Sequence, residues 1–166
     1  MKIVACSNCG REAEIVRGSY FFIESGLDCV VLQGIELIRC EHCENEDPII
    51  PRINDLMRVL ALAVIGKPHR LCGTEVRFLR KYLMKTGEEM AQMLGVSKTT
   101  ISKWENDEDP IGPSSDRLFR VIALAIGEGL QEKLQEMIEM FPRIERQPPR
   151  KVNIEIDPIK QSYRYV

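Results

Sequence analysis

The segment with the clearest structural signature is LRKYLMKTGEEMAQMLGVSKTTISKWEN, residues 79–106. Thr86 and Glu89 have the spacing of a helix capping box, and Gly95 is typical of the position where such a helix ends. Ser97 is a favourable cap for a second helix that follows at once. The segment therefore predicts two short helices joined by a tight turn.

The second predicted helix has one apolar side and one polar side. Ile101 and Trp104 share a helical face and are expected to be buried. The opposite face would then expose the side chains of Lys98, Thr99, Ser102 and Lys103. Hydrogen-bonding side chains gathered on one exposed helix face are suited to the major groove of DNA, so the pattern predicts a DNA-binding surface.

Thr99 and Lys103 lie one turn apart on this face and are the best candidates for base contacts. Phosphate contacts are expected from Lys85, Thr86 and Asn106. The complete set of predicted DNA-binding residues is Lys85, Thr86, Lys98, Thr99, Thr100, Ser102, Lys103 and Asn106.

The two helices and their turn resemble the helix-turn-helix of the Xre/Cro-like transcriptional regulators. The resemblance rests on the turn at residues 94–97 and the run Ile-Ser-Lys-Trp-Glu at residues 101–105. It departs from the family at Gly87, where glutamine is common, so lysine side chains would have to supply the missing contact. A helical bundle that binds only proteins is the open alternative.

A second motif consists of two C-x-x-C pairs, Cys6 with Cys9 and Cys40 with Cys43. Each pair can form a knuckle that directs two thiolates at one ion, and two knuckles complete a tetrahedral site. Four thiolates leave no open coordination position, which favours one structural Zn²⁺ ion over a catalytic one. Iron in a rubredoxin-like site and two disulfides are the rival interpretations.

The sequence between the cysteine pairs predicts short strands at residues 14–23 and 28–39, separated by glycine turns. A zinc ribbon results, and a domain this small would depend on its metal for much of its stability. Neither of the remaining cysteines, Cys29 and Cys72, nor His42 or His69, is expected to be a ligand or a catalytic group. We predict that the chain is not an enzyme.

The charge of the chain is uneven along its length. Its 166 residues carry a net charge of −2, but residues 1–48 hold four basic and nine acidic side chains. Residues 75–126 balance at eight of each, but Arg77, Arg80, Lys81 and Lys85 precede the second predicted helix, so a local basic face is possible without a basic protein. The sequence has no apolar stretch of membrane-spanning length and no signal-peptide pattern, so a cytoplasmic protein is expected.

Four segments follow from these patterns: a zinc ribbon at 1–48, a linker helix at 49–70, a helix-turn-helix and dimerisation domain at 71–141, and a tail at 142–166. The predicted fold is α+β, a small β domain followed by an all-α bundle of about five helices. Apolar stripes at 114–126 and 130–141 predict a homodimer through the C-terminal helices, unless both stripes close over the core of one chain.

The tail is predicted to be a basic arm that reaches DNA or an ordinary solvated terminus. Its basic residues are Arg143, Arg146, Arg150 and Lys151. Residues 152–156 alternate as a strand does and could add to a sheet, either in a dimer or on a partner.

The combination of a four-cysteine ribbon and an Xre-type motif, covering residues 1–126, resembles the MqsA-type antitoxins. The resemblance implies a repressor that dimerises on a palindromic operator, represses its own operon, and binds a ribonuclease toxin through its N-terminal domain. A zinc-ribbon adaptor that binds proteins but no DNA is the alternative, and it predicts no salt-dependent shift of DNA.

Overall fold

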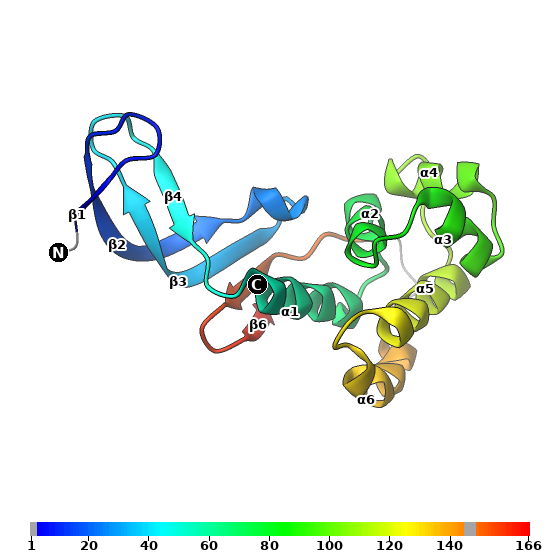
Figure 1. Cartoon of the computed structure of the whole chain (residues 1–166). Helices are drawn as coiled ribbons and strands as arrows, with labels where there is room; N and C mark the ends of the chain where they lie inside the picture. The colour runs from blue at the N-terminus through cyan, green and yellow to red at the C-terminus, as the bar shows by residue number, and fades with distance from the viewer. Residues whose placement is uncertain (1–2, 145–148) are drawn as a thin grey trace.

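The computed structural model describes residues 3–144 and 149–166, and its α+β fold confirms the prediction. The strands are β1 (Ile3–Ala5), β2 (Glu12–Phe21), β3 (Val30–Arg39), β4 (Glu46–Ile49), β5 (Ile154–Asp157) and β6 (Ser162–Tyr165). The helices are α1 (Ile53–Gly66), α2 (Gly73–Tyr82), α3 (Gly87–Leu94), α4 (Lys98–Glu105), α5 (Pro113–Ile126) and α6 (Leu134–Met140), with short 3-10 turns η1 (Ile23–Ser25), η2 (Gln131–Lys133) and η3 (Phe141–Arg143). The sheet lies at one end of the molecule and the helices at the other (Figure 1).

Strand β3 is the centre of the sheet, whose order is β1-β2-β3-β5-β6. One edge of β3 pairs with β2 along most of its length, and the other edge is shared between two short strands. Its C-terminal half pairs with β4, which was not predicted, and its N-terminal half pairs in parallel with β5. The predicted strands at 14–23 and 28–39 therefore correspond to β2 and β3 with slightly shifted ends.

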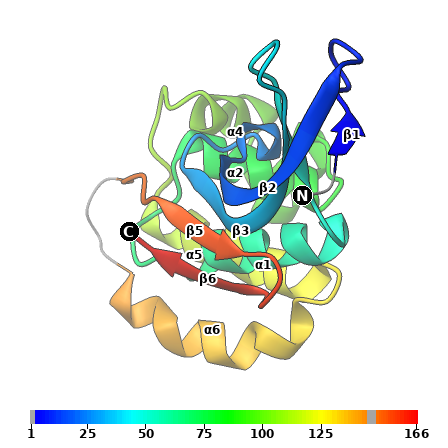
Figure 2. The ribbon, with the colours of Figure 1, turned by 90° about the vertical axis from the view of Figure 1, so that its left-hand side faces the viewer.

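The C-terminal residues 149–166 form a hairpin in the chain's own sheet, so the prediction of a basic arm or a solvated terminus is wrong for them. Strand β5 confirms the alternating pattern, but its partner is β3 of the same chain (Figure 2). Lys151 forms an ion pair with Asp28, and the Arg150 carbonyl accepts a hydrogen bond from the buried Lys67. Arg146 lies outside the described residues.

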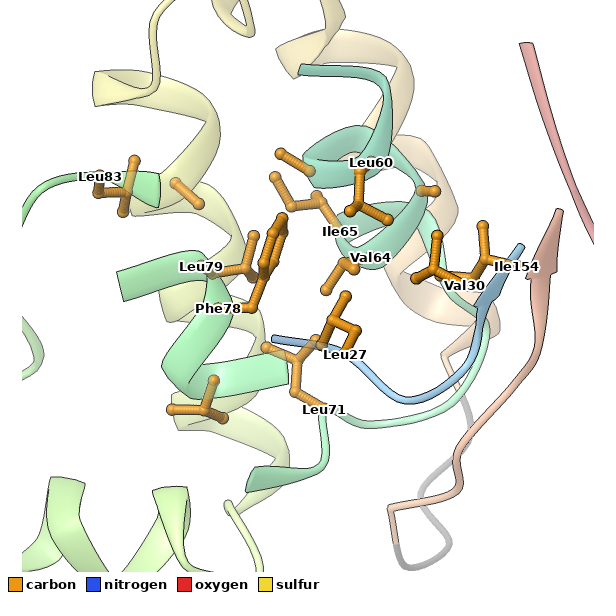
Figure 3. Packing of buried hydrophobic residues seen from close by; sticks show 14 of the residues in the cluster. Leu27, Val30, Leu60, Val64, Ile65, Leu71, Phe78, Leu79, Leu83 and Ile154 are labelled. Carbon is orange, nitrogen blue, oxygen red and sulfur yellow. The ribbon is translucent and has the colours of Figure 1, made fainter. Parts of the chain in front are cut away.

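Helix α1 is buried almost all round, because the sheet and the helix bundle cover different sides of it. Leu60, Ala61, Ala63 and Val64 are fully buried. Figure 3 shows α1 side chains between Val30 and Ile154 of the sheet and Phe78 and Leu79 of α2. The residues of the sheet and of the helices thus belong to one continuous hydrophobic core, so α1 is a shared core element as well as a connection.

A buried ion pair fixes the loop between α1 and α2. Arg120 of α5 binds Asp116 at 2.9 Å and donates hydrogen bonds to the carbonyls of Ile65, Lys67 and His69. Both side chains of the pair are fully buried, and such a charge is stable in the interior only when its hydrogen bonds are met. The pair therefore holds the loop against α5.

The last apolar stripe closes over the core of its own chain to a large extent. Leu130 is fully buried and Met137 of α6 is 4 % exposed. Helix α6 packs on α1 and α5. A residual apolar surface stays exposed, with Leu118 and Ile126 on α5 and Ile138 on α6. None of the helices in the described part of the chain combines the length and apolarity needed to cross a bilayer.

Candidate functional site

The four cysteines of the two C-x-x-C pairs come together. They belong to the β1–β2 and β3–β4 turns, which lie at the end of the sheet remote from the helices (Figure 1). Their sulfur atoms all lie within 4.8 Å of one another. The Sγ atoms of Cys6 and Cys43 are 3.6 Å apart, as are those of Cys9 and Cys40. Tetrahedral thiolates on a zinc-sized ion stand about 3.8 Å apart, given a metal–sulfur bond of about 2.3 Å. This donor set can therefore hold one metal ion.

Each knuckle closes through backbone hydrogen bonds and a left-handed residue. The Cys6 amide donates to the Arg11 carbonyl at 2.8 Å, and the Cys40 amide donates to Asn45 at 3.0 Å. Gly10 has a φ of +71° after the first pair, as expected for a glycine there. Glu44 takes the equivalent place after the second pair with a φ of +56°, a conformation that a side chain disfavours.

Polar side chains tie the two knuckles to each other. Ser7 donates a short hydrogen bond to the Asp47 carboxylate, and Asn45 donates to the same carboxylate at 2.9 Å. The ring of His42 faces Arg11 across the knuckles at 3.4 Å and is not one of the gathered ligands. The polar contacts orient the knuckles from outside the cluster, and no sequence motif had pointed to them.

The other two cysteines are core residues. Cys29 and Cys72 are 7 % and 6 % exposed and do not belong to the gathered ligands. Burial raises the pKa of Cys29 to about 11, and it also raises the pKa of Cys72. Both groups therefore stay as neutral thiols at neutral pH, which agrees with the sequence-based interpretation.

The four gathered cysteines have a small apolar cluster of their own. Cys6, Ala13 and Cys40 form its buried part, and they are separate from the main core around α1. The inner half of the sheet is buried against α1 instead. The sheet thus has a second source of stability that the expectation of a metal-dependent domain had left out.

The predicted helix-turn-helix is present as α3 and α4. The Thr86 side chain accepts from the Glu89 amide at 3.2 Å, and the Glu89 carboxylate accepts from the Thr86 amide at 2.8 Å. Gly95 ends α3 with a φ of +67°, and Ser97 caps α4 by accepting from the Thr100 amide. The local signals in the sequence therefore predicted this motif well.

Helix α4 buries one face and exposes the other. Ile101 and Trp104 are 1 % and 7 % exposed. Six of the predicted DNA-binding residues are exposed and come together around α4 and its neighbouring turns, namely Thr86, Lys98, Thr99, Ser102, Lys103 and Asn106. Lys85 and Thr100 are half-buried. Thr100 is close to the cap, because its hydroxyl lies 2.8 Å from that of Ser97.

Arg77 and Arg80, two of the basic residues considered for a local basic face, both bind the end of α4. Arg80 makes a two-pronged contact with the Glu105 carboxylate at 2.5 and 2.9 Å. Its third nitrogen donates to the Lys85 carbonyl at 2.9 Å. The hydrogen bonds to Glu105 raise the pKa of Arg80. Arg77 donates to the Glu105 carbonyl and to Asn106 Oδ1, so both charges serve to position α4.

Gly73 lets the start of α2 come very close to the end of α4. A Cβ atom at this position would lie 2.5 Å from the Trp104 carbonyl oxygen and 2.8 Å from that of Glu105. The Gly73 amide donates to Asp107 Oδ1 at 2.7 Å. Only glycine fits such a contact between backbones, and sequence periodicity could not have indicated it.

Residues 76–124 match the helix-turn-helix family model. The matched segment begins in α2 and ends in α5, and it includes the whole of α3 and α4. The match supports a DNA-binding regulator of the Xre type. No curated protein and no solved structure matched the chain.

Cys40→Ser should remove the bound metal ion, because the cluster has no spare ligand among the described residues. We expect the metal content, measured by atomic spectroscopy, to fall from one ion per chain to a small fraction. The helical circular dichroism should persist, since the metal cluster is separate from the main core. Cys29→Ala is the matched control and should keep the metal. Loss of helicity together with the metal would contradict this independence.

Gly73→Ala should destabilise the protein by about 1–3 kcal/mol, because its new methyl group meets backbone atoms that must move. Urea unfolding would measure the change. Gly87→Ala is the control, since its nearest neighbour is Lys98 Cγ at 4.0 Å. That variant should be neutral or more stable by up to about 1 kcal/mol. Equal stability of the two variants would show that the α2–α4 contact is not tight.

Proposed function

We propose that the protein is a sequence-specific DNA-binding repressor whose base contacts come from the exposed face of α4. The observation that supports this most directly is the arrangement of α4 itself. Its apolar side is fully used in packing, while Thr99, Ser102 and Lys103 are exposed. Side chains of this kind can pair with base edges in the major groove.

The proposed contacts fall into two classes. Thr99 and Lys103 contact bases, with Lys98 and Ser102 beside them. The turn before α3, with Lys85 and Thr86, faces phosphate, where the N-terminal end of α3 adds a favourable helix dipole. Asn106 is held by Arg77 through its Oδ1 atom, and its amide nitrogen donates a long hydrogen bond of 3.5 Å to the Ser102 hydroxyl.

We propose that the ion held by the four cysteines is zinc. Four sulfur ligands at the spacing of a tetrahedral site fit zinc. They leave no coordination position for a reacting water, so the ion has a structural role. Its effect is to hold the knuckles, and thereby the outer ends of β2 and β3, in one conformation.

We also propose a homodimer that places two copies of α4 on a palindromic operator. The support is the residual apolar surface of α5, where Leu118 and Ile126 are 43 % and 46 % exposed and Ile122 lies between them. These positions share one helical face. Two α4 helices related by a two-fold axis would contact half-sites one DNA turn apart.

Operator repression by an antitoxin is the most specific form of this proposal. The resemblance to MqsA-type antitoxins and the acidic excess of residues 1–48 support it, because an acidic surface favours a basic ribonuclease. Co-purification of a basic protein encoded by the neighbouring gene, lost on charge reversal of the exposed Glu12 and Glu41 but kept by Lys103→Ala, would support this form. The adaptor alternative requires that the protein shift no duplex DNA at low salt.

Lys103→Ala should lower the affinity for an operator selected from a random duplex library by about 1–3 kcal/mol and relax the preference at one base position. Lys85→Ala should weaken operator and random DNA alike and reduce the salt slope by about 1. Fluorescence anisotropy over a salt series would measure both. Equal losses on the two DNAs for Lys103→Ala would count against base contact.

Leu118→Glu should convert the dimer to a monomer, because a charge would then stand in the proposed apolar interface. Sedimentation equilibrium would measure the mass. Phe21→Glu is the control, because Phe21 is 69 % exposed at the end of β2. It should leave the mass unchanged, and a monomeric wild type would exclude this interface.

A further inference from the structure

The turn that follows α4 is built on the backbone of Lys103. The amides of Glu108 and Asp109 both donate to the Lys103 carbonyl, at 2.9 and 3.4 Å. Asp107 has a φ of +55°, and its carboxylate is held by the Gly73 amide. The turn is therefore fixed both to α4 and to the start of α2.

This turn brings a carboxylate to the side chain of Lys103. The Oδ2 atom of Asp109 lies 3.3 Å from Lys103 Nζ, and both side chains are about half exposed. Asp107, Glu108 and Asp109 also lie at the C-terminal end of α4, where the helix dipole disfavours negative charge. The placement of three acids there opposes both helix stability and phosphate binding, and packing does not require the exposed Asp109.

We infer that Asp109 is a specificity-determining residue that competes with DNA phosphate for Lys103. This inference rests on the proposed DNA-binding function of α4. On random DNA, Lys103 could only exchange one anion for another, so it stays paired with Asp109 and contributes no phosphate contact. On the operator, base acceptors in the major groove compensate for the lost ion pair.

The same geometry gives the size and direction of the effect. Removing the carboxylate frees Lys103 for phosphate on any sequence, which adds about one ionic contact and steepens the salt slope by about 1. At moderate salt, this extra contact makes the protein without the carboxylate bind random duplex about 5–10-fold more tightly than the wild type does. In the operator complex, Lys103 already contacts a base and its ion pair with Asp109 is already broken. Removing the carboxylate saves only the small cost of breaking that exposed ion pair, so the affinity for the operator changes less.

The test compares Asp109→Asn with the wild-type protein on a random-sequence duplex and on an operator selected in vitro, by anisotropy over a salt series. We expect the random duplex to bind about 5–10-fold tighter and the operator-to-random ratio to fall about 2–5-fold. In the Lys103→Ala background, Asp109→Asn should have no further effect on the random duplex. Glu132→Gln, in η2, changes the net charge of the protein by the same amount as Asp109→Asn and is the control for long-range electrostatic effects.

Each result supports or overturns the inference. A gain on random DNA that requires Lys103 and is absent from Glu132→Gln supports it. If the wild type binds DNA and Asp109→Asn binds random duplex no better, or if the gain persists without Lys103, the inference is wrong while the proposed function stands. If the wild type binds neither duplex, the proposed function fails and the inference fails with it.

Discussion

The burial of α1 on both of its sides is the constraint on which the rest of the structure depends. The sheet would have a bare apolar face without it, and the helix bundle would lose one wall of its core. Because α1 packs on both the sheet and the helix bundle through the same few turns, the four-cysteine end of the sheet and the helix-turn-helix keep one relative orientation. A partner bound to the sheet would therefore occupy a defined place relative to the DNA contacted by α4.

The distribution of charge around α4 explains how a chain with a net charge of −2 can be suited to DNA. Arg77 and Arg80 are engaged by Glu105, so they orient α4 and add little positive potential outside. Free positive charge near α4 comes from a few lysines, one of which is paired with Asp109. Few phosphate contacts per chain mean weak non-specific binding. In the proposed dimeric repressor, base discrimination and two-fold symmetry would then contribute more to operator affinity than bulk electrostatics.

Local signals were sufficient to predict the helix-turn-helix and the gathering of the four cysteines. The capping box at Thr86, the left-handed Gly95 and the C-x-x-C pairs each depend on residues that are near neighbours in the sequence. The long-range features were not predictable in the same way. The strand pattern at 152–156 was visible, but nothing in its alternation identifies β3 as its partner. Likewise, the sign of a charge does not show that Arg80 binds Glu105, and no periodicity shows that Gly73 touches α4.

The parallel pairing of β3 with β5 has a consequence for how the protein forms in the cell. The ion pair beside this pairing joins residues 123 positions apart in the sequence, so the edge of β3 stays open while the intervening chain is synthesised. An unpaired strand edge is a template for aggregation. The nascent chain is therefore prone to aggregate through this edge until residues 154–165 leave the ribosome and β5 pairs with β3.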